Sequence, residues 1–212
     1  MTIQHEAFVN LYNSDNRIFN KLLDGVSKST TLFNRIDKLS ENFSNYGYND
    51  QFKMKGDLFE IFGELYLRIL GPHPTIGVYN FKPEDSVYDN GVDGTGIGID
   101  GKPLTVQFKF RSNATDELIA EDLNQFGFQS IVKYGVDKDT KTNMVLFTCA
   151  KGLHYHTDNE VFANRIRTIG VKEIDYGAKG YPFWKTVADM IEATVKERYT
   201  KEIYDKFTPI NI

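Results

Sequence analysis

The chain has 212 residues, 41% of them hydrophobic and 14% aromatic, so it can bury a full core as one domain with an accessory segment. Its one cysteine, Cys149, excludes an internal disulfide. No charged-then-apolar amino-terminal stretch and no run of about 18 apolar residues occurs, so we expect a cytoplasmic protein with no membrane partner. The net charge of −4 argues against tight nonspecific binding to phosphate-rich polymers, although local charge decides such binding.

Residues 1–50 are expected to form a helical amino-terminal segment. Apolar residues recur there at helical spacing in two stripes, which are Ile18, Phe19, Leu22, Leu23 and Val26, and Leu32, Phe33, Ile36, Leu39 and Phe43. We expect these helices to cover the core or a partner copy, with nucleic-acid binding as the alternative.

The segment from Lys55 to Leu70 is predicted to be an amphipathic helix that ends before Gly71-Pro72. Glu60 and Glu64 lie four residues apart on its polar face, where two carboxylates repel unless a cation or a basic group lies between them. Arg68 can pair with Glu64, which leaves Glu60 as the freer metal ligand. A solvated helix face would explain the same residues, and for Glu64 it is the preferred explanation.

A strand is predicted from Leu104 to Arg111, because apolar and polar residues alternate strictly there. One face carries Leu104, Val106, Phe108 and Phe110, and the other carries Thr105, Gln107, Lys109 and Arg111. The pattern predicts one dry face and one polar face, as in any half-solvated sheet. Because side chains at i and i+2 share a face, Gln107 and Lys109 can converge with Asp93 of the preceding strand.

The face on which Asp93 lies depends on the hairpin turn around Gly101. A two-residue turn at Asp100-Gly101 would pair Asp93 with Phe108 and point the carboxylate into the core. A three-residue loop over 100–102 would pair Asp93 with Lys109 on the polar face, and a glycine bulge within 94–98 would have the same effect. A site built on Asp93 therefore requires an odd-length turn or a bulge.

Two further helices are predicted downstream. Thr115 can cap a helix that begins at Asp116-Glu117, runs through Ile131 and crosses behind the strand bearing Lys109. The last helix spans about 183–199, and its interspersed acids and bases indicate a solvated lid on the sheet. The expected units are thus 1–50, a core of 51–178 and a carboxy-terminal helix within 179–212 that packs on the core.

The order Gly56-x-x-x-Glu60, Gly91-Val92-Asp93 and Gln107-x-Lys109 resembles the PD-(D/E)XK nuclease superfamily, in particular its Mrr-like branch with Gln in place of the usual acid. The resemblance covers residues 55–175, and Pro83-Glu84-Asp85 is a competing match to its first acidic motif. It implies an α/β fold with a central mixed β-sheet flanked by helices, a restriction endonuclease-like core. Residues 146–148, 159–168 and 171–175 resemble the later strand, helix and strand of that core.

The resemblance also implies a function, that of a metal-dependent DNA endonuclease of the restriction, homing or recombination type. Asp93, Glu60 and Gln107 would hold Mg²⁺, or Mn²⁺ as a substitute, with Glu64 in reserve. Lys109 would orient or deprotonate the attacking water or stabilise the transition state. We also expect DNA contacts from Arg111, Lys102 and Lys55. A homodimer is expected, because two strands must be cut.

Two alternatives stay open. The first is a catalytically decayed nuclease-fold module that binds DNA, in which Gln107 marks decay of the site. The second is a structure-selective nuclease that acts on junctions or RNA.

Two other motifs favour ordinary structure over a binding site. Residues 96–101 match GxGxxG, yet Lys102-Pro103 and a strand follow where a dinucleotide-binding fold needs a helix. His154 and His156 near Cys149 could suggest zinc, but an ordinary loop is the preferred explanation without a further spaced ligand.

Overall fold

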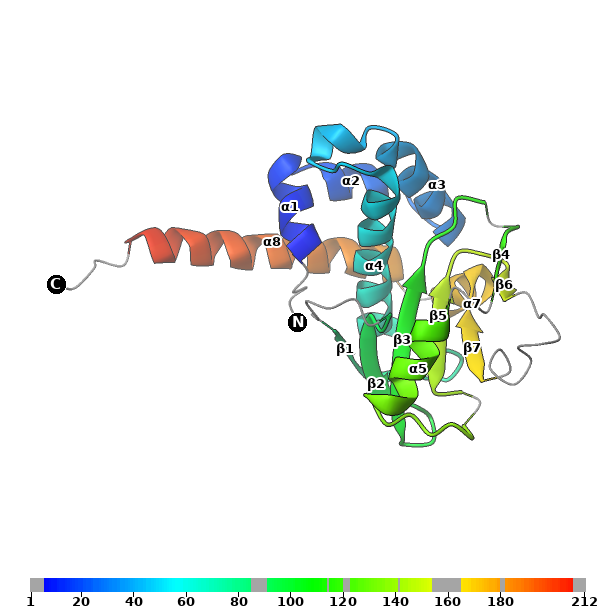
Figure 1. Ribbon diagram of the computed structural model, residues 1–212. Helices are drawn as coiled ribbons and strands as arrows, with labels where there is room; N and C mark the ends of the chain where they lie inside the picture. The colour runs from blue at the N-terminus through cyan, green and yellow to red at the C-terminus, as the bar shows by residue number, and fades with distance from the viewer. Residues whose placement is uncertain are drawn as a thin grey trace.

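A five-stranded mixed sheet forms the centre of the fold, with helices on both faces (Figure 1). The structure is a computed structural model, and it describes residues 6–84, 91–113, 115–119, 123–140, 142–153, 165–179 and 182–207, with side chains as far as residue 196. The strand order is β1-β2-β3-β5-β7, and these strands are Tyr79–Pro83, Gly94–Ile97, Pro103–Lys109, Met144–Thr148 and Ile166–Ile169. β1, β2 and β3 pair antiparallel, whereas β3, β5 and β7 pair parallel. The predicted α/β class with a mixed sheet is confirmed.

The amino-terminal segment is helical, as predicted. Its elements are α1 (Glu6–Ser14), α2 (Ile18–Leu23), α3 (Ser29–Ser40) and the short 3₁₀ helix η1 (Phe43–Tyr46). Residues of both apolar stripes are buried, among them Ile18 and Leu22 on α2 and Leu32 and Ile36 on α3. The helices form because burial of these stripes supplies the stability that such short helices lack alone.

The long helix α4 (Gln51–Leu70) packs on one face of the sheet. It begins earlier than the motif alone indicated, because the Asp50 carboxylate accepts hydrogen bonds from the backbone N–H groups of Phe52 and Lys53. It ends at Leu70, as predicted. Gly63 lets it approach β3, since a Cβ there would lie 2.3 Å from the Phe108 ring.

The opposite face of the sheet is covered by α5 (Asn124–Val132). Thr105 on β3 and Ser130 on α5 share a hydrogen bond of 2.7 Å in the interior. The predicted polar face of β3 is therefore not solvated, and Thr105 and Gln107 are both buried. The prediction that a helix crosses behind the strand of Lys109 is confirmed.

The predicted start of that helix was wrong. Glu117–Leu118 forms a short strand, β4, which pairs with β6 (Gly152–Leu153) in a separate two-stranded sheet. Thr115 donates its backbone N–H and its hydroxyl to the side-chain oxygen of Asn113, so it closes a turn instead of capping a helix.

The later strand, helix and strand implied by the resemblance are also corrected. Residues 146–148 lie in β5, as expected, but 166–168 belong to strand β7, and 159–164 lie outside the described residues. Val171–Gly177 forms the helix α7 instead of a strand. Its first turn is stabilised because the Glu173 carboxylate accepts from the backbone N–H of Gly170 at 3.0 Å.

The last helix, α8 (Phe183–Phe207), is longer than predicted and leaves the body of the molecule past α1 (Figure 1). Its first half is anchored by the buried side chains of Phe183, Val187 and Ile191. These belong to the same hydrophobic cluster as residues of α1 to α4 and of the sheet. Within the described part of the chain, no helix is long and apolar enough to span a bilayer.

Candidate active site

The candidate site lies where β2 and β3 separate. The two strands are joined by residues 98–102, and their register pairs Gly94 with Val106. This connection has an odd length, as the site hypothesis required, but it is longer than the three-residue loop. Continued by one residue, the register brings Asp93 opposite Gln107 instead of Lys109.

Asp93 marks the end of the regular pairing between these strands. Its backbone N–H donates to the carbonyl of Val106 at 2.9 Å, and its Oδ2 accepts from the backbone N–H of Phe108 at 2.6 Å. The Asp93 carboxylate thus accepts a hydrogen bond from the backbone of β3 where a backbone carbonyl would accept it in a continued strand pair. These two hydrogen bonds hold Asp93, the first candidate acid, where β2 and β3 separate.

A small pocket of about 40 Å³ opens beside Asp93. Its walls are formed by Glu60, Glu64, Pro83, Glu84, Asp93 and Phe108. Glu60 and Asp93, from a helix and a strand that are distant in sequence, therefore line one pocket. The volume leaves room for a few water-sized groups and not for a nucleotide.

Glu64 and Glu84 of this pocket each have a basic partner. Glu64, 2% exposed, forms an ion pair of 2.6 Å with Arg68, which confirms the predicted pairing. The solvated face that was preferred for Glu64 is wrong, because α4 turns this residue inward. Glu84 lies 3.5 Å from the ammonium of Lys133, which follows α5.

Gln107 lies on β3, one residue before Phe108, and is not among the residues that line this pocket. Its side chain is 4% exposed, and its Oε1 has no hydrogen-bond partner within the described residues. Its amide nitrogen comes within 3.5 Å of the place where a Cβ on Gly91 would lie. Gly91 has φ +67°, a conformation that favours glycine, so the tight Gly91–Asp93 segment and Gln107 fit together.

Lys109 is the last residue of β3, one residue beyond Phe108. It is half-buried, and its ammonium makes no ion pair with the side chains described. By strand alternation it shares a face with Gln107. Lys109 and Gln107 thus flank Phe108, whose backbone N–H holds the Asp93 carboxylate.

The three residues expected to contact DNA are dispersed. Lys55 is buried, and its ammonium contacts Asp37 at 2.6 Å and Ser112 at 3.0 Å. Lys102 lies at the far end of β3 and pairs with Asp137 at 3.0 Å. Arg111 follows the site end of β3, where its guanidinium donates to the carbonyl of Phe110 at 3.1 Å.

Glu84 is the residue at this pocket that the motif order did not assign. The backbone N–H of Glu84 donates to the carbonyl of Asp93 at 3.0 Å, and Pro83 pairs with Gly94. The two competing acidic motifs therefore lie side by side on neighbouring strands, and Asp85 falls outside the described residues. The signal that could have found Glu84 is the pairing of its strand with that of Asp93.

The acidic surroundings extend along α4 to Tyr48. The Tyr48 hydroxyl donates to Asp57 at 2.9 Å, and Asp57 also pairs with Lys53 at 2.6 Å. Burial raises the pKa of Tyr48, and the carboxylates of Asp57 and Glu60 raise it further. Glu60 and Asp57 are thus close enough to Tyr48 for their charges to act on its hydroxyl.

Cys149 is not part of such chemistry. It is buried between backbone groups of Arg111, and burial raises the pKa of its thiol to about 11. A thiol with this pKa is protonated at neutral pH and is a poor metal ligand. His154 and His156, the other groups in the zinc alternative, lie outside the described residues.

The donor atoms at the pocket suit Mg²⁺ better than zinc. Carboxylates are hard oxygen ligands. The Oε1 of Gln107, which lies outside the pocket lining, is a buried acceptor without a partner among the described residues. Among the described residues, no group of three or more His, Cys, Asp or Glu side chains is arranged to enclose a metal. Mg²⁺ needs only one or two protein carboxylates and keeps several waters, so Glu60 and Asp93 suffice.

Comparison with known proteins found no family model and no curated relative that matches this chain. The resemblance to PD-(D/E)XK nucleases therefore rests on the sequence motifs and their order.

Proposed function

We propose that the protein is a metal-dependent DNA endonuclease that hydrolyses phosphodiester bonds. The observation that carries the proposal is the meeting of Glu60 and Asp93 at one pocket, beside the end of the strand that bears Gln107 and Lys109. An acid from a helix, an acid where two strands separate and a lysine on the next strand supply what phosphodiester hydrolysis needs.

Asp93 and Glu60 would hold Mg²⁺ or Mn²⁺, and Gln107 could add a neutral carbonyl ligand. The cation would supply positive charge to a non-bridging phosphate oxygen and lower the pKa of a bound water. Asp93 is suited to its role because the Phe108 amide fixes its Oδ2 and so limits the orientations of its carboxylate.

Lys109 would act on the attacking water and on the phosphate. Its ammonium can orient the water or, once deprotonated, accept a proton from it. As an ammonium it also offsets the negative charge that builds up on the phosphate in the transition state. Because this charge is greatest in the transition state, loss of Lys109 should lower the rate more than the affinity.

The pocket is too small for a nucleotide, so DNA would lie across its mouth and present a single phosphate to it. The carboxylates there repel DNA until a cation neutralises them, which would limit indiscriminate cleavage in a protein of net charge −4. One site cuts one strand, so a homodimer that cuts both strands is part of the proposal.

The test is incubation with supercoiled plasmid in Mg²⁺, in Mn²⁺ and in chelator. We expect nicked or linear DNA only with metal, and a rate about 100-fold or more lower in Asp93→Asn and in Lys109→Met. Asn at position 93 keeps an acceptor for the Phe108 amide, so this variant removes the charge and preserves the local fold. Asp139→Asn and Lys172→Met, at exposed positions, are the matched controls.

Equal cleavage by the site variants and their controls would refute the site.

A DNA-binding module without activity is the second candidate, and the neutral Gln107 in place of an acid favours it. Calorimetry separates the two. Absence of Mg²⁺ and Mn²⁺ binding in a well-folded protein that still retains DNA would select the binding module.

A further inference from the structure

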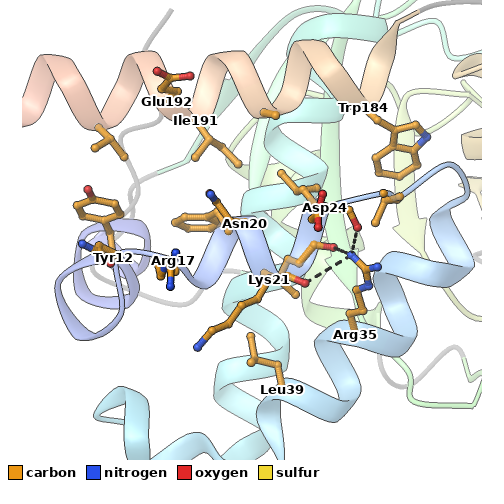
Figure 2. Close-up of a pocket in the computed structure, with 18 of the residues that line it drawn as sticks. Tyr12, Arg17, Asn20, Lys21, Asp24, Arg35, Leu39, Trp184, Ile191 and Glu192 are labelled. Carbon is orange, nitrogen blue, oxygen red and sulfur yellow. Dashed lines mark hydrogen bonds between the residues drawn. The ribbon is translucent and has the colours of Figure 1, made fainter.

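A second, much larger depression lies among the helices, away from the candidate active site. Figure 2 shows this groove, of about 1220 Å³, between α8 and the amino-terminal helices α1, α2 and α3. None of its lining residues lines the pocket at Asp93. What it binds is therefore a question separate from the proposed cleavage.

The groove presents aromatic surface near both ends. Tyr12 of α1 and Trp184 of α8 lie at opposite sides of the view in Figure 2, and both are half-buried. Trp184 is held in place because its ring stacks on Phe62 at a centroid distance of 6.0 Å. Fixed aromatic rings that remain partly exposed are surfaces on which nucleic-acid bases stack.

The charge of the groove is opposite to that of the chain. Its lining contains Arg17, Lys21, Arg35, Lys38 and Lys185 against Asp24 and Glu192, whereas the whole chain carries −4. An excess of basic residues in one depression of an acidic protein indicates an anionic ligand.

The basic residues do not all have the same role. Arg35 faces inward, where its Nη1 donates to the carbonyls of Leu22 at 3.0 Å and Asp24 at 2.6 Å, so it holds the end of α2. Arg17 and Lys38 are exposed and have no ion pair with the side chains described. They are the cations best placed to meet phosphates.

Lys21 and Lys185 are also available. Each pairs with a neighbouring aspartate, at 2.5 Å for Lys21 with Asp15 and at 2.6 Å for Lys185 with Asp189. Both ammonium groups are exposed, and such surface pairs are weak enough for a phosphate to compete.

The lining also contains three asparagines, beside apolar residues of the same helices. Asn16 precedes α2, Asn20 lies on it and Asn42 follows α3. Primary amides both donate and accept hydrogen bonds, as base edges do. The groove thus combines stacking surfaces, cations and amides, which is the combination that recognises unpaired nucleotides.

We propose that this groove binds a segment of single-stranded nucleic acid several nucleotides long. The volume exceeds that of a usual small-molecule pocket, about 300 to 1000 Å³, and suits an extended ligand. A duplex keeps its bases stacked inside and offers no ring face to Tyr12 or Trp184. The proposal does not depend on nuclease activity.

The test is fluorescence anisotropy with a labelled oligothymidylate of about 12 nucleotides, in chelator so that no cleavage occurs. We expect binding that weakens with salt. Arg17→Gln/Lys38→Gln should bind about 25-fold more weakly at 0.1 M salt, because two lost contacts lower the log–log salt slope by about 1.4. Tyr12→Ala should lose about 5- to 150-fold through one lost stack.

Lys172→Gln/Lys179→Gln changes the net charge equally at exposed positions of α7 and the turn after it, and should leave the affinity nearly unchanged. Equal loss in this control would refute the groove, since only net charge would then matter. Equal binding of a hairpin duplex of the same length would refute the preference for single strands. Absence of oligonucleotide binding, with capture of a synthetic acidic amphipathic peptide, would assign the groove to a protein partner instead.

Discussion

Gln107 is a buried amide whose oxygen finds no partner within the described residues. Leaving a buried acceptor unsatisfied costs about 1 to 3 kcal/mol, so such a group needs an explanation in terms of function. A cation held by Asp93 and Glu60 would provide one. The residue thus connects the stability of the fold with the proposed chemistry.

Gln107→Glu tests this connection through stability. In chelator the variant should unfold at a lower temperature, because it buries a carboxylate without a compensating charge, at a cost of about 2 to 4 kcal/mol. Mg²⁺ or Mn²⁺ should recover more stability in the variant than in the wild type, because the added charge strengthens binding to the folded state.

Thermal unfolding with and without metal measures both effects, and Gln125→Glu at an exposed position of α5 is the control. Equal destabilisation of Gln107→Glu with and without metal would show that Gln107 is structural only.

For single residues, the sequence predicted the position on a helix or strand better than the side chain that each residue contacts. The helical spacing of Glu60 and the need for an odd-length connection before Gln107 follow from backbone periodicity, which is local. The ion pairs of Lys55 with Asp37 and of Lys102 with Asp137 do not follow from the sequence. A lysine in the sequence carries no sign of the carboxylate that it meets after folding. Glu84 was recognised only as part of a competing motif, and its place beside Asp93 did not follow because it depends on strand pairing.

Among the elements, α4 has the greatest influence on the site, because it carries Glu60 and contacts the strand of Phe108. The contact is made at Gly63, where a Cβ would come within 2.3 Å of the Phe108 ring. Gly56, on the same helix, has no atom within 4 Å of its Cβ position. Alanine substitution at Gly56 therefore tests helix propensity alone, whereas substitution at Gly63 also tests packing against Phe108.

Gly63→Ala should destabilise the protein by about 1 to 3 kcal/mol, because overpacking against Phe108 outweighs the better helix propensity of alanine. Gly56→Ala should stabilise it by about 0.5 to 1 kcal/mol. Urea unfolding of both variants measures the difference. A gain of stability in Gly63→Ala would mean that α4 moves away from β3 without cost.

Elements with strong periodicity were predicted correctly, and short ones were not. α4 and β3 carry long unambiguous patterns, whereas the seven residues after Gly170 are compatible with both a strand and a helix by their apolar residues alone. The capping interaction of Glu173 decides for the helix. Residues 115–118 turned out differently because an asparagine-closed turn competes with a helix cap.

Over the whole molecule, a three-way contact joins the amino-terminal helices to the core. Asp37 of α3 meets Lys55 of α4 at 2.6 Å and accepts from the Ser112 hydroxyl at 2.6 Å. The apolar cluster that unites these elements with the sheet and α8 is continuous. The amino-terminal helices thus cover the core, as their apolar stripes and the composition led us to expect.

This contact predicts a pH dependence. Partial burial would raise the pKa of Asp37, but hydrogen bonds from Lys55 and Ser112 outweigh burial and lower it below the ordinary value of 3.8. The stabilisation is therefore complete above that value and is lost as the pH falls through the lower folded pKa. Asp37→Asn should lower the melting temperature at pH 7 and lose less stability than the wild type between pH 4 and pH 2.

Melting curves across this range, with Asp139→Asn as control, measure the contribution. Parallel curves for wild type and Asp37→Asn would show that other carboxylates govern acid unfolding.

The hydrogen bond of 2.6 Å from the Phe108 amide to Asp93 also makes the Phe108 amide proton a reporter for NMR spectroscopy. An amide proton that donates to a carboxylate resonates according to the charge on that carboxylate, so its chemical shift records each change at Asp93. Titration with Mg²⁺ or with acid should displace this one resonance well before distant amides respond. Occupancy of the pocket thus becomes observable in a protein that is cleaving nothing.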